Sequence, residues 1–279
     1  TNGCSWNRCS FCEMYTAEQK AFRAKPLAEV REDLALLREL WRCGPQVPPP
    51  RLFLADGDAM TLPAGRLRAV LASVREAFPD VARVASYCLP RNLRGKTVEE
   101  LAELRELGLR TLYVGCESGD DEVLRRVGKG ETAESSLAAL QKIRQAGLKA
   151  SVMILHGLGG SQLSEQHARN SARLISEAQP NFLSTLVVSF PMGRERHAAG
   201  FQDLPGGGFQ ELTPEEVLEE MALFIDGLEL KRTIFRSDHA SNYLALKGVL
   251  GRDKGRLLAE VAQARAGLVA LRPEWARGL

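Results

Sequence analysis

The stretch Cys4-Ser5-Trp6-Asn7-Arg8-Cys9-Ser10-Phe11-Cys12 places three thiols within nine residues of a chain that has six cysteines. A loop this short cannot pair three thiols with one another as disulfides, whereas one inorganic centre can bind all three sulfurs. Structural zinc sites close with four ligands, and most cubane iron–sulfur clusters also have four cysteine ligands. Three ligands with no fourth nearby therefore predict a metal centre with one open coordination position.

Two other interpretations of this stretch stay open. A distant histidine could complete a zinc site, and Cys9 and Cys12 could form a redox pair, but neither uses all three thiols economically. The remaining cysteines, Cys43, Cys88 and Cys116, are isolated in sequence. Isolated thiols suit a reducing compartment, so a cytoplasmic location is expected.

Helical and strand patterns alternate after the cysteine stretch. Apolar residues at helical spacing predict helices within 27–41, 67–74, 98–107, 137–143 and 168–178, and a later helix starting at Thr213. Short apolar runs predict strands over 51–55, 81–88, 111–116, 150–155 and 182–190. Six βα-like units with short connections predict an α/β fold, a parallel (β/α)6 partial TIM-type barrel with right-handed crossovers. A doubly wound sheet is the main alternative.

The domain boundary is expected near residue 190. Residues 1–190 would form the partial barrel, and residues 191–279, which start with a Pro- and Gly-rich stretch, an α-rich extension covering the barrel mouth. Only Thr1, Asn2 and Gly3 precede the cysteines. Because such a barrel needs a strand there, we expect the first strand to be truncated and the chain to be a fragment of a longer protein.

Charge and hydropathy exclude several classes of partner. The 37 Lys and Arg residues nearly balance the 35 Asp and Glu residues, so the chain lacks the basic surplus of general nucleic-acid binders. No apolar run approaches the ~20 residues that span a bilayer, and no leader pattern opens the chain. A soluble protein without a membrane partner is expected.

The cysteine stretch resembles that of the radical S-adenosylmethionine (radical SAM) superfamily. Its members have three closely spaced cysteines after the first barrel strand and an aromatic residue just before the third, the position of Phe11. The usual spacing has three residues between the first two cysteines, and this chain has four, which we interpret as a mark of a subfamily. The chain is most similar to an uncharacterised subgroup near the coproporphyrinogen oxidase-like and Elongator-like iron–sulfur oxidoreductases. The resemblance implies that Cys4, Cys9 and Cys12 bind a [4Fe–4S] cluster, and that S-adenosylmethionine is the second cofactor.

Functional groups of such barrels lie on the loops that follow the strands. Asp56-Gly57-Asp58 follows the first predicted strand and resembles the superfamily's Gly-Gly-Glu motif, which receives the methionyl amino group. Asp58 matches the glutamate of that motif as a shorter acid. The plain alternative is an Asp-Gly turn with solvated charges.

Later loops add further cofactor contacts by the same resemblance. Glu117 and Ser118 resemble the polar pair that receives ribose hydroxyls or an amine, and Lys129 stands where relatives pair a basic residue with the methionyl carboxylate. Gly157 lies in a glycine-rich bend that lets the backbone approach a nucleotide, although relatives often have an acid where Met153 stands. The plain alternatives are a helix N-cap cluster over 120–122 and a solvated lysine.

The stretch 233–242 changes from an apolar triplet to mostly polar residues. It resembles a strand that delivers hydrogen-bonding groups to a site, with a solvated loop as the plain alternative. We expect Arg236 and His239 to face the barrel cavity and contact substrate.

The resemblance implies a reaction as well as a fold. An electron from a reductase, or from a flavodoxin- or ferredoxin-type donor, would cleave S-adenosylmethionine to a 5′-deoxyadenosyl radical. This radical would abstract hydrogen from an unidentified small-molecule or peptide substrate. Two other classes stay open: a non-catalytic iron–sulfur or zinc protein, and a nucleic-acid-modifying radical SAM enzyme, against which the near-neutral charge argues.

Overall fold

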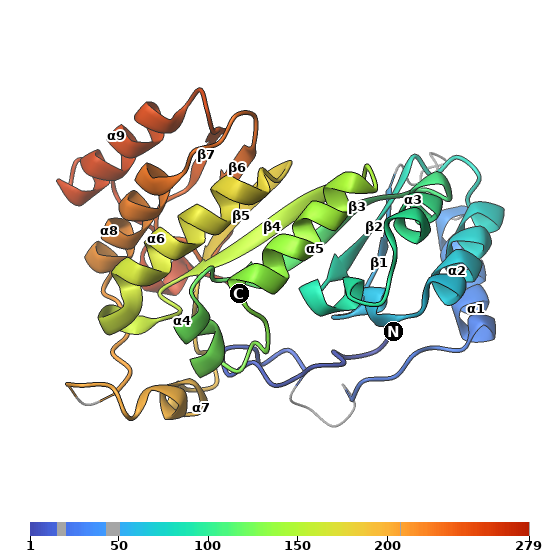
Figure 1. Cartoon of the computed structure of the whole chain (residues 1–279), viewed down its shortest axis with the longest axis horizontal. Helices are drawn as coiled ribbons and strands as arrows, with labels where there is room; N and C mark the ends of the chain where they lie inside the picture. The colour runs from blue at the N-terminus through green and yellow to red at the C-terminus, as the bar shows by residue number, and fades with distance from the viewer. Residues whose placement is uncertain (16–20, 43–50, 207, 279) are drawn as a thin grey trace. The chain divides into compact units, whose positions relative to one another are not determined.

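The computed structural model describes residues 1–15, 21–42, 51–206 and 208–278 (Figure 1). Within them, seven strands form one mixed, mostly parallel sheet, and their order along the sheet is their order along the chain. The strands are β1 (Arg51–Leu54), β2 (Arg83–Cys88), β3 (Leu109–Glu117), β4 (Lys149–His156), β5 (Phe182–Val187), β6 (Ile234–Ser237) and β7 (Leu246–Val249). β1, β2 and β3 pair in parallel, as do β4, β5 and β6, whereas β7 runs antiparallel to β6. This order confirms the partial TIM-type barrel and excludes the doubly wound alternative, in which the strand order reverses.

The chain divides into two compact units. The first comprises residues 1–7, 14–115 and 139–150, and the second comprises residues 8–13, 116–138 and 151–279. The cysteine stretch contributes to both, because Cys4 belongs to the first unit and Cys9 and Cys12 belong to the second.

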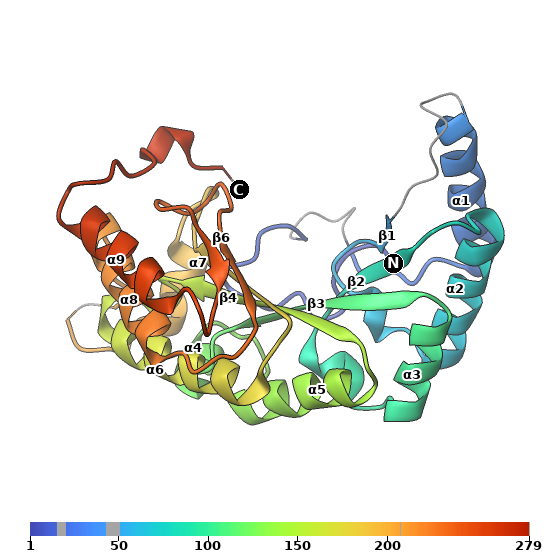
Figure 2. The same ribbon diagram turned by 90° about the horizontal axis from the view of Figure 1, so that it is seen from above.

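The first unit contains α1 (Leu27–Arg42), α2 (Ala64–Ala77) and α3 (Val98–Glu106). Along β2, the side chains of Val84, Ser86 and Cys88 are buried and alternate with exposed ones, so one face of the strand is covered. Helices α2 and α3 lie along that side of β1 to β3 (Figure 2). α3 begins with a reciprocal capping box, because Glu100 N donates to Thr97 Oγ1 at 3.2 Å and Thr97 N donates to Glu100 Oε2 at 3.0 Å.

The second unit contains α4 (Asp121–Arg126), α6 (Gly160–Ala178), α7 (Glu195–Ala198), α8 (Pro214–Gly227) and α9 (Lys254–Arg265), and α5 (Ala133–Gln145) runs from it into the first unit. Short 3-10 turns cover Ala59–Thr61, Pro90–Leu93, Ala199–Phe201 and Glu274–Ala276. α6 packs against α8, and α8 packs against α9. Leu183, Phe224 and Phe235 are fully buried in the core of this unit.

Every helix and strand predicted above is present, with ends shifted by a few residues. Three features differ. The strand expected over 182–190 ends at Val187, the stretch after Phe190 contains α7 rather than only a loop, and β7 and α9 complete the chain without having been predicted. The expected N-cap is confirmed, because Val123 N donates to Asp120 Oδ1 at 2.9 Å.

Cys88 and Cys116 are buried and form no disulfide, and Cys43 lies outside the described residues. Burial raises the pKa of Cys116 to about 12, so this thiol stays protonated at neutral pH. Among the helices that the structure describes, none is both long and apolar enough to cross a bilayer.

Candidate functional site

In the first unit, the loop after β1 binds the start of the cysteine stretch. Gly3 N donates to Asp56 Oδ2 at 2.7 Å, and Ser5 N donates to Asp58 Oδ2 at 3.2 Å. The Ser5 hydroxyl donates to the same Asp58 oxygen. Burial raises the pKa of the fully buried Asp58, and the hydrogen bonds from Ser5 offset only part of that effect. The two predicted carboxylates therefore fix the backbone on both sides of Cys4.

The backbone of this loop has little conformational freedom. Asp56 has a left-handed φ of 55°, which is uncommon outside glycine. A Cβ on Gly57 would lie 2.7 Å from ring carbons of Tyr15, so a larger residue there would require the Tyr15 ring to move. The Tyr15 carbonyl oxygen in turn accepts a hydrogen bond from Asn7 Nδ2 at 2.8 Å. The predicted close approach at Gly57 is thus made, in this structure, by an aromatic ring.

In the second unit, Cys9 and Cys12 lie on one tight turn that α7 supports. Cys12 N donates to Cys9 O at 3.2 Å and closes the turn. The Arg196 guanidinium donates to both carbonyl oxygens, through Nη2 to Cys9 at 2.8 Å and through Nη1 to Cys12 at 3.0 Å. One planar side chain therefore fixes the backbone of two predicted cluster ligands.

The neighbouring Ser10 is fixed by two further groups. Ser10 N donates to Val127 O at 2.9 Å, and Ser10 Oγ lies 3.0 Å from His197 Nδ1. His197 Nε2 lies 3.1 Å from Leu158 O; since a carbonyl only accepts, Nε2 carries the proton and Nδ1 accepts from the serine. Burial lowers the pKa of His197 to about 4, which keeps the imidazole neutral at neutral pH.

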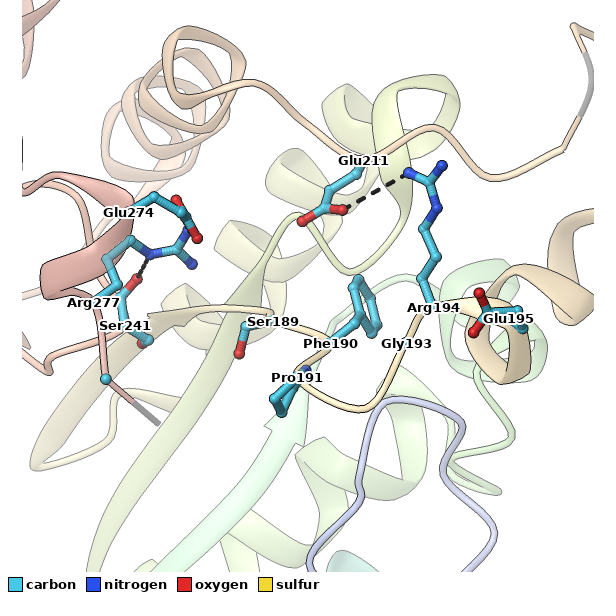
Figure 3. A pocket seen from close by; sticks show the side chains of 11 residues that line it. Ser189, Phe190, Pro191, Gly193, Arg194, Glu195, Glu211, Ser241, Glu274 and Arg277 are labelled. Carbon is cyan, nitrogen blue, oxygen red and sulfur yellow. Dashed lines mark hydrogen bonds and ion pairs between the residues drawn. The ribbon is translucent and has the colours of Figure 1, made fainter.

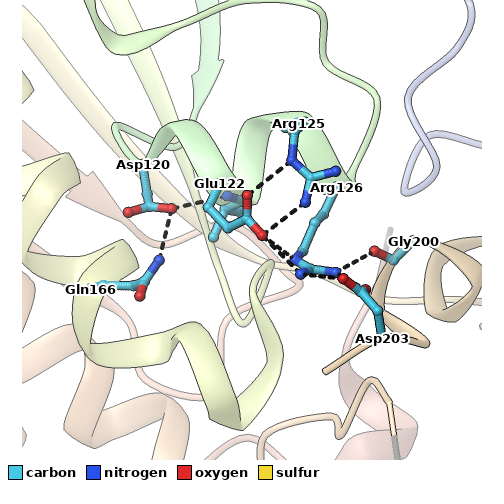
Figure 4. A network of polar contacts seen from close by, with 8 residues as sticks. Asp120, Glu122, Arg125, Arg126, Gln166, Gly200 and Asp203 are labelled. Atoms are coloured by element: carbon cyan, nitrogen blue, oxygen red, sulfur yellow. Dashed lines mark hydrogen bonds and ion pairs between the residues drawn. The ribbon is translucent and has the colours of Figure 1, made fainter. Parts of the chain in front are cut away.

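A buried arginine anchors the segment that follows α7 (Figure 4). Arg126 of α4 donates to Gly200 O at 2.9 Å and to both carboxylate oxygens of Asp203, at 2.5 and 3.1 Å. A side chain on Gly200 would overlap the Arg126 carbonyl oxygen, so the close approach of the two segments requires glycine. α4 thereby holds the short helix that supplies Arg196 and His197.

Arg196 and His197 are the site residues that sequence reasoning missed. Their signal was the polar run Arg194-Glu195-Arg196-His197 inside a Pro- and Gly-rich stretch. A four-residue helix is too short for its periodicity to be recognised, so the stretch was expected to be a loop.

The end of β3 brings three predicted residues together. Lys129 Nζ lies 3.1 Å from Glu117 Oε1 in a buried ion pair, and 5.9 Å from the centroid of the Phe11 ring. Burial alone would lower the pKa of Lys129, but attraction by Glu117 and Cys9 outweighs it and raises that pKa. Glu117 has a left-handed φ of 65°, and its buried Oε2 has no hydrogen-bond partner among the described residues. A strained acid with one free buried oxygen is a feature typical of ligand sites.

Ser118 and Gly157 use their polar groups within the protein. Ser118 Oγ lies 2.8 Å from His167 Nδ1 and accepts from Asp120 N at 2.9 Å. Gly157 N donates to Glu220 Oε1 at 2.8 Å, and the glycine has a left-handed φ of 79°. In this structure both residues support the loops at the ends of β3 and β4.

Arg236 and His239 are both exposed. Arg236 lies on β6 and forms an ion pair with Asp238 at 3.6 Å, and His239 Nδ1 lies 3.0 Å from Ser241 Oγ in the next loop. Among the described residues, no contact joins either side chain to Glu117 or Lys129.

The second unit also has an open cavity of about 500 Å³ beyond the ends of β5 and β6 (Figure 3). Its lining contains both positively and negatively charged side chains. The Arg194 guanidinium lies 4.0 Å from Glu211, and Arg277 donates to Ser241 O at 2.8 Å and to Glu274 at 2.7 Å. Phe190, which also lines it, packs with Phe11 against one apolar core cluster. The volume and polarity suit a small charged ligand.

The donor set of the cysteine stretch fits an iron–sulfur cluster. Cys4, Cys9 and Cys12 form no disulfide, and each is half-buried, accessible to an incoming metal. No group of three His, Cys, Asp or Glu side chains within the described ranges is already arranged around a common metal position. The protein supplies the thiolates and fixes their backbone by separate networks at Cys4 and at the Cys9–Cys12 turn.

The partial barrel, the three thiols and the polar strand ends define an α/β-barrel protein with a candidate three-thiolate metal site. The sequence profile of the radical SAM superfamily matches residues 1–172, and the chain belongs to this superfamily. The match confirms the resemblance seen in the cysteine stretch. Members of the superfamily use a [4Fe–4S] cluster and S-adenosylmethionine.

Individual relatives are distant. The chain is 27% identical over 162 residues to 4'-phospho-dehydrooxetanocin synthase of Priestia megaterium, which is 53% of this chain and 21% of that protein. It thus spans about a fifth of the length of this relative.

Two solved structures show the same fold. Coproporphyrinogen III oxidase (HemN) of Escherichia coli, a radical SAM enzyme, gives a TM-score of 0.59 at 17% identity and covers 81% of this chain and 51% of its own. The archaeal Elp3 of Methanocaldococcus infernus gives 0.54 at 17% identity and covers 88% of this chain and 60% of its own. Both lie in the groups that the sequence resemblance indicated.

Proposed function

We propose that this chain is a radical SAM enzyme that cleaves S-adenosylmethionine reductively and uses the resulting 5′-deoxyadenosyl radical to abstract hydrogen from a substrate. The observation that best supports the proposal is the turn formed by Cys9 and Cys12. Its two cysteines, which form no disulfide, lie inside the superfamily match, and their carbonyl oxygens both accept hydrogen bonds from Arg196. A backbone fixed on both sides of its ligands presents the thiolates without further ordering.

Cys4, Cys9 and Cys12 would hold the cluster. When bound, the cluster supplies the electron that cleaves the sulfonium and an open iron for the amino acid end of S-adenosylmethionine. Asp56 and Asp58 support this site through the backbone, because their carboxylates accept hydrogen bonds from Gly3 N and Ser5 N. We therefore assign both aspartates primarily to positioning Cys4. A methionyl group would reach the backbone at Gly57 on the side of the Tyr15 ring only after that ring moves aside.

Glu117 and Lys129 would receive the polar parts of S-adenosylmethionine. Their ion pair is buried, and within the described ranges Glu117 Oε2 has no hydrogen-bond partner, so a ribose hydroxyl or an amine can donate to it without displacing Lys129. Lys129 would pair with the methionyl carboxylate, and Phe11 and the half-buried Met153 offer apolar surface to the nucleoside. Ser118 and Gly157 would shape this pocket through the backbone.

The remaining partners follow from the chemistry. A one-electron donor is required, and we propose a reductase or a flavodoxin- or ferredoxin-type protein. The charged cavity beside Phe190 would take a polar part of the substrate, and Arg236 and His239 remain candidates for contacts to a larger substrate.

Replacement of a single ligand tests the proposal. The Cys9→Ala protein, prepared without oxygen, should lose bound iron and form no 5′-deoxyadenosine with dithionite and S-adenosylmethionine. A Cys88→Ser variant is the control, because Cys88 is buried outside the cysteine stretch and should leave iron content unchanged. Unchanged deoxyadenosine formation by Cys9→Ala would refute the assignment.

A further inference from the structure

Three aromatic side chains form an exposed cluster on the open face of the first three strands. Phe53 of β1, Tyr87 of β2 and Tyr113 of β3 are 38%, 41% and 38% exposed. Ring centroids are 4.8 Å apart for Phe53 and Tyr87, 5.4 Å for Phe53 and Tyr113, and 6.3 Å for Tyr87 and Tyr113. The rings thus make one continuous surface in the first unit.

The alternation of the strands places this surface opposite the helices. Cys88 and Val114 are buried, whereas their neighbours Tyr87 and Tyr113 are exposed and lie directly opposite each other across the strand pair. Phe53 lies opposite Ala85, whose small side chain leaves the face of its ring open. Large aromatic residues left together in water at this density mark a binding surface.

Two arginines lie on the same face at the amino ends of the strands. Arg51 and Arg83 are direct register partners, and both are exposed. Like charges opposite each other on a sheet are unfavourable. Neither guanidinium has an ion-pair or hydrogen-bond partner among the residues that the structure describes. An anion bound between them would remove the repulsion and accept from both.

The spacing between the arginines and the aromatic residues limits the length of the ligand. Arg51 lies two residues before Phe53, and Arg83 lies four residues before Tyr87, which corresponds to ~7 and ~13 Å along the strands. The aromatic end is close to the loop that binds the start of the cysteine stretch, because Asp56 of this loop follows Phe53 by three residues. Within the first unit, a planar apolar group would lie toward the loop after β1, and an anionic group would lie away from it.

We propose that this surface, Phe53, Tyr87 and Tyr113 with Arg51 and Arg83, binds a substrate with a planar aromatic or conjugated body and a carboxylate or phosphate about 10 Å away. This inference rests on the proposed function for its meaning as a substrate site. The binding itself requires neither cluster nor reductant, so it can be tested separately.

Fluorescence titration with two matched probes tests the surface on the purified holoprotein at low salt. The anionic probe is 1-pyrenebutyrate, whose carboxylate is separated from the planar ring system by a propylene chain, and the neutral probe is 1-pyrenebutanol. The Arg51→Gln/Arg83→Gln double variant should lower the affinity for the anionic probe about tenfold and the affinity for the neutral probe less than about twofold. The Tyr87→Ala/Tyr113→Ala double variant should lower the affinity for both probes about fivefold or more. Arg144→Gln and Trp275→Ala remove an exposed arginine and an exposed aromatic residue elsewhere, and should change neither.

The outcomes that overturn the proposal are equally definite. Probe affinities within about twofold of the parent for both double variants would exclude the surface, as would equal losses of both probes in the arginine variant. A dimer that dissociates in the tyrosine variant, with no change in probe binding, would assign the surface to a second copy of the chain. Circular dichroism verifies that each variant folds. Because cleavage of S-adenosylmethionine is measured without substrate, its failure is distinguished from failure of this surface.

Discussion

At the residue scale, the buried pair formed by Glu117 and Lys129 gives the sharpest prediction. Lys129→Met leaves the Glu117 carboxylate buried without its counter-ion, so the free energy of unfolding should fall by about 3 kcal/mol. Glu117→Gln/Lys129→Met removes both charges and should recover most of that loss. Urea denaturation measures both. If the double variant is as unstable as the single one, the loss comes from packing rather than from the unpaired charge.

Gly128 tests how closely the cysteine stretch packs in the second unit. It has a left-handed φ of 65°, and a Cβ there would lie 2.9 Å from the Arg8 carbonyl oxygen. Gly128→Ala should therefore lower the free energy of unfolding by about 1–2 kcal/mol. Gly255→Ala in α9 is the control, because nothing lies within 4 Å of its Cβ position and alanine favours the helix. Equal effects of the two substitutions would contradict the proposed close approach.

At the scale of elements, the four-residue helix α7 acts on the predicted cluster ligands. Arg196→Gln cannot donate to both Cys9 O and Cys12 O in the same bidentate way, so the turn should loosen. We expect a reconstituted Arg196→Gln protein to release iron to a chelator several-fold faster than the parent. Arg173→Gln, at an exposed position on α6, should release iron at the parental rate. Identical rates for Arg196→Gln and the parent would show that the turn is stable without this side chain.

His197 gives α7 a pH signature. Its folded-state pKa of about 4 is below the ordinary 6.5, so the unfolded chain binds the proton more readily. The contribution of neutral His197 is complete above pH 6.5 and is lost as the pH falls toward 4. Relative to His197→Gln, the cluster-free parent should lose roughly 3 kcal/mol of stability over that range. A stability difference independent of pH between 7 and 4 would contradict a buried neutral imidazole.

At the scale of the whole molecule, the sequence predicted the fold because the fold is periodic. Apolar runs such as Arg51–Leu54 and capped helices such as α8, which begins with a box between Thr213 and Glu216, are determined locally. β7 escaped prediction because Leu246–Val249 is four residues long and half exposed, too short for its period to be seen.

The site was predictable only where one residue type determines the chemistry. The cysteines were found from their spacing, and Glu117 and Lys129 from the resemblance to relatives. Their pairing with each other depends on burial in the folded chain, which no local sequence pattern encodes. Asp58 was also recognised from the sequence as a candidate site residue, but its hydrogen bond from Ser5 N was not predicted. Tertiary contacts such as that of Arg196 with the cysteine turn require the folded chain.

The most direct test of the central claim is reductive cleavage by protein that carries a full cluster. Anaerobically reconstituted chain with about four irons and four sulfides should convert S-adenosylmethionine, with dithionite, to 5′-deoxyadenosine and methionine in equal amounts. Chromatography with mass detection measures both products. Protein that binds one zinc, or that holds the full cluster and forms no 5′-deoxyadenosine, would contradict the claim.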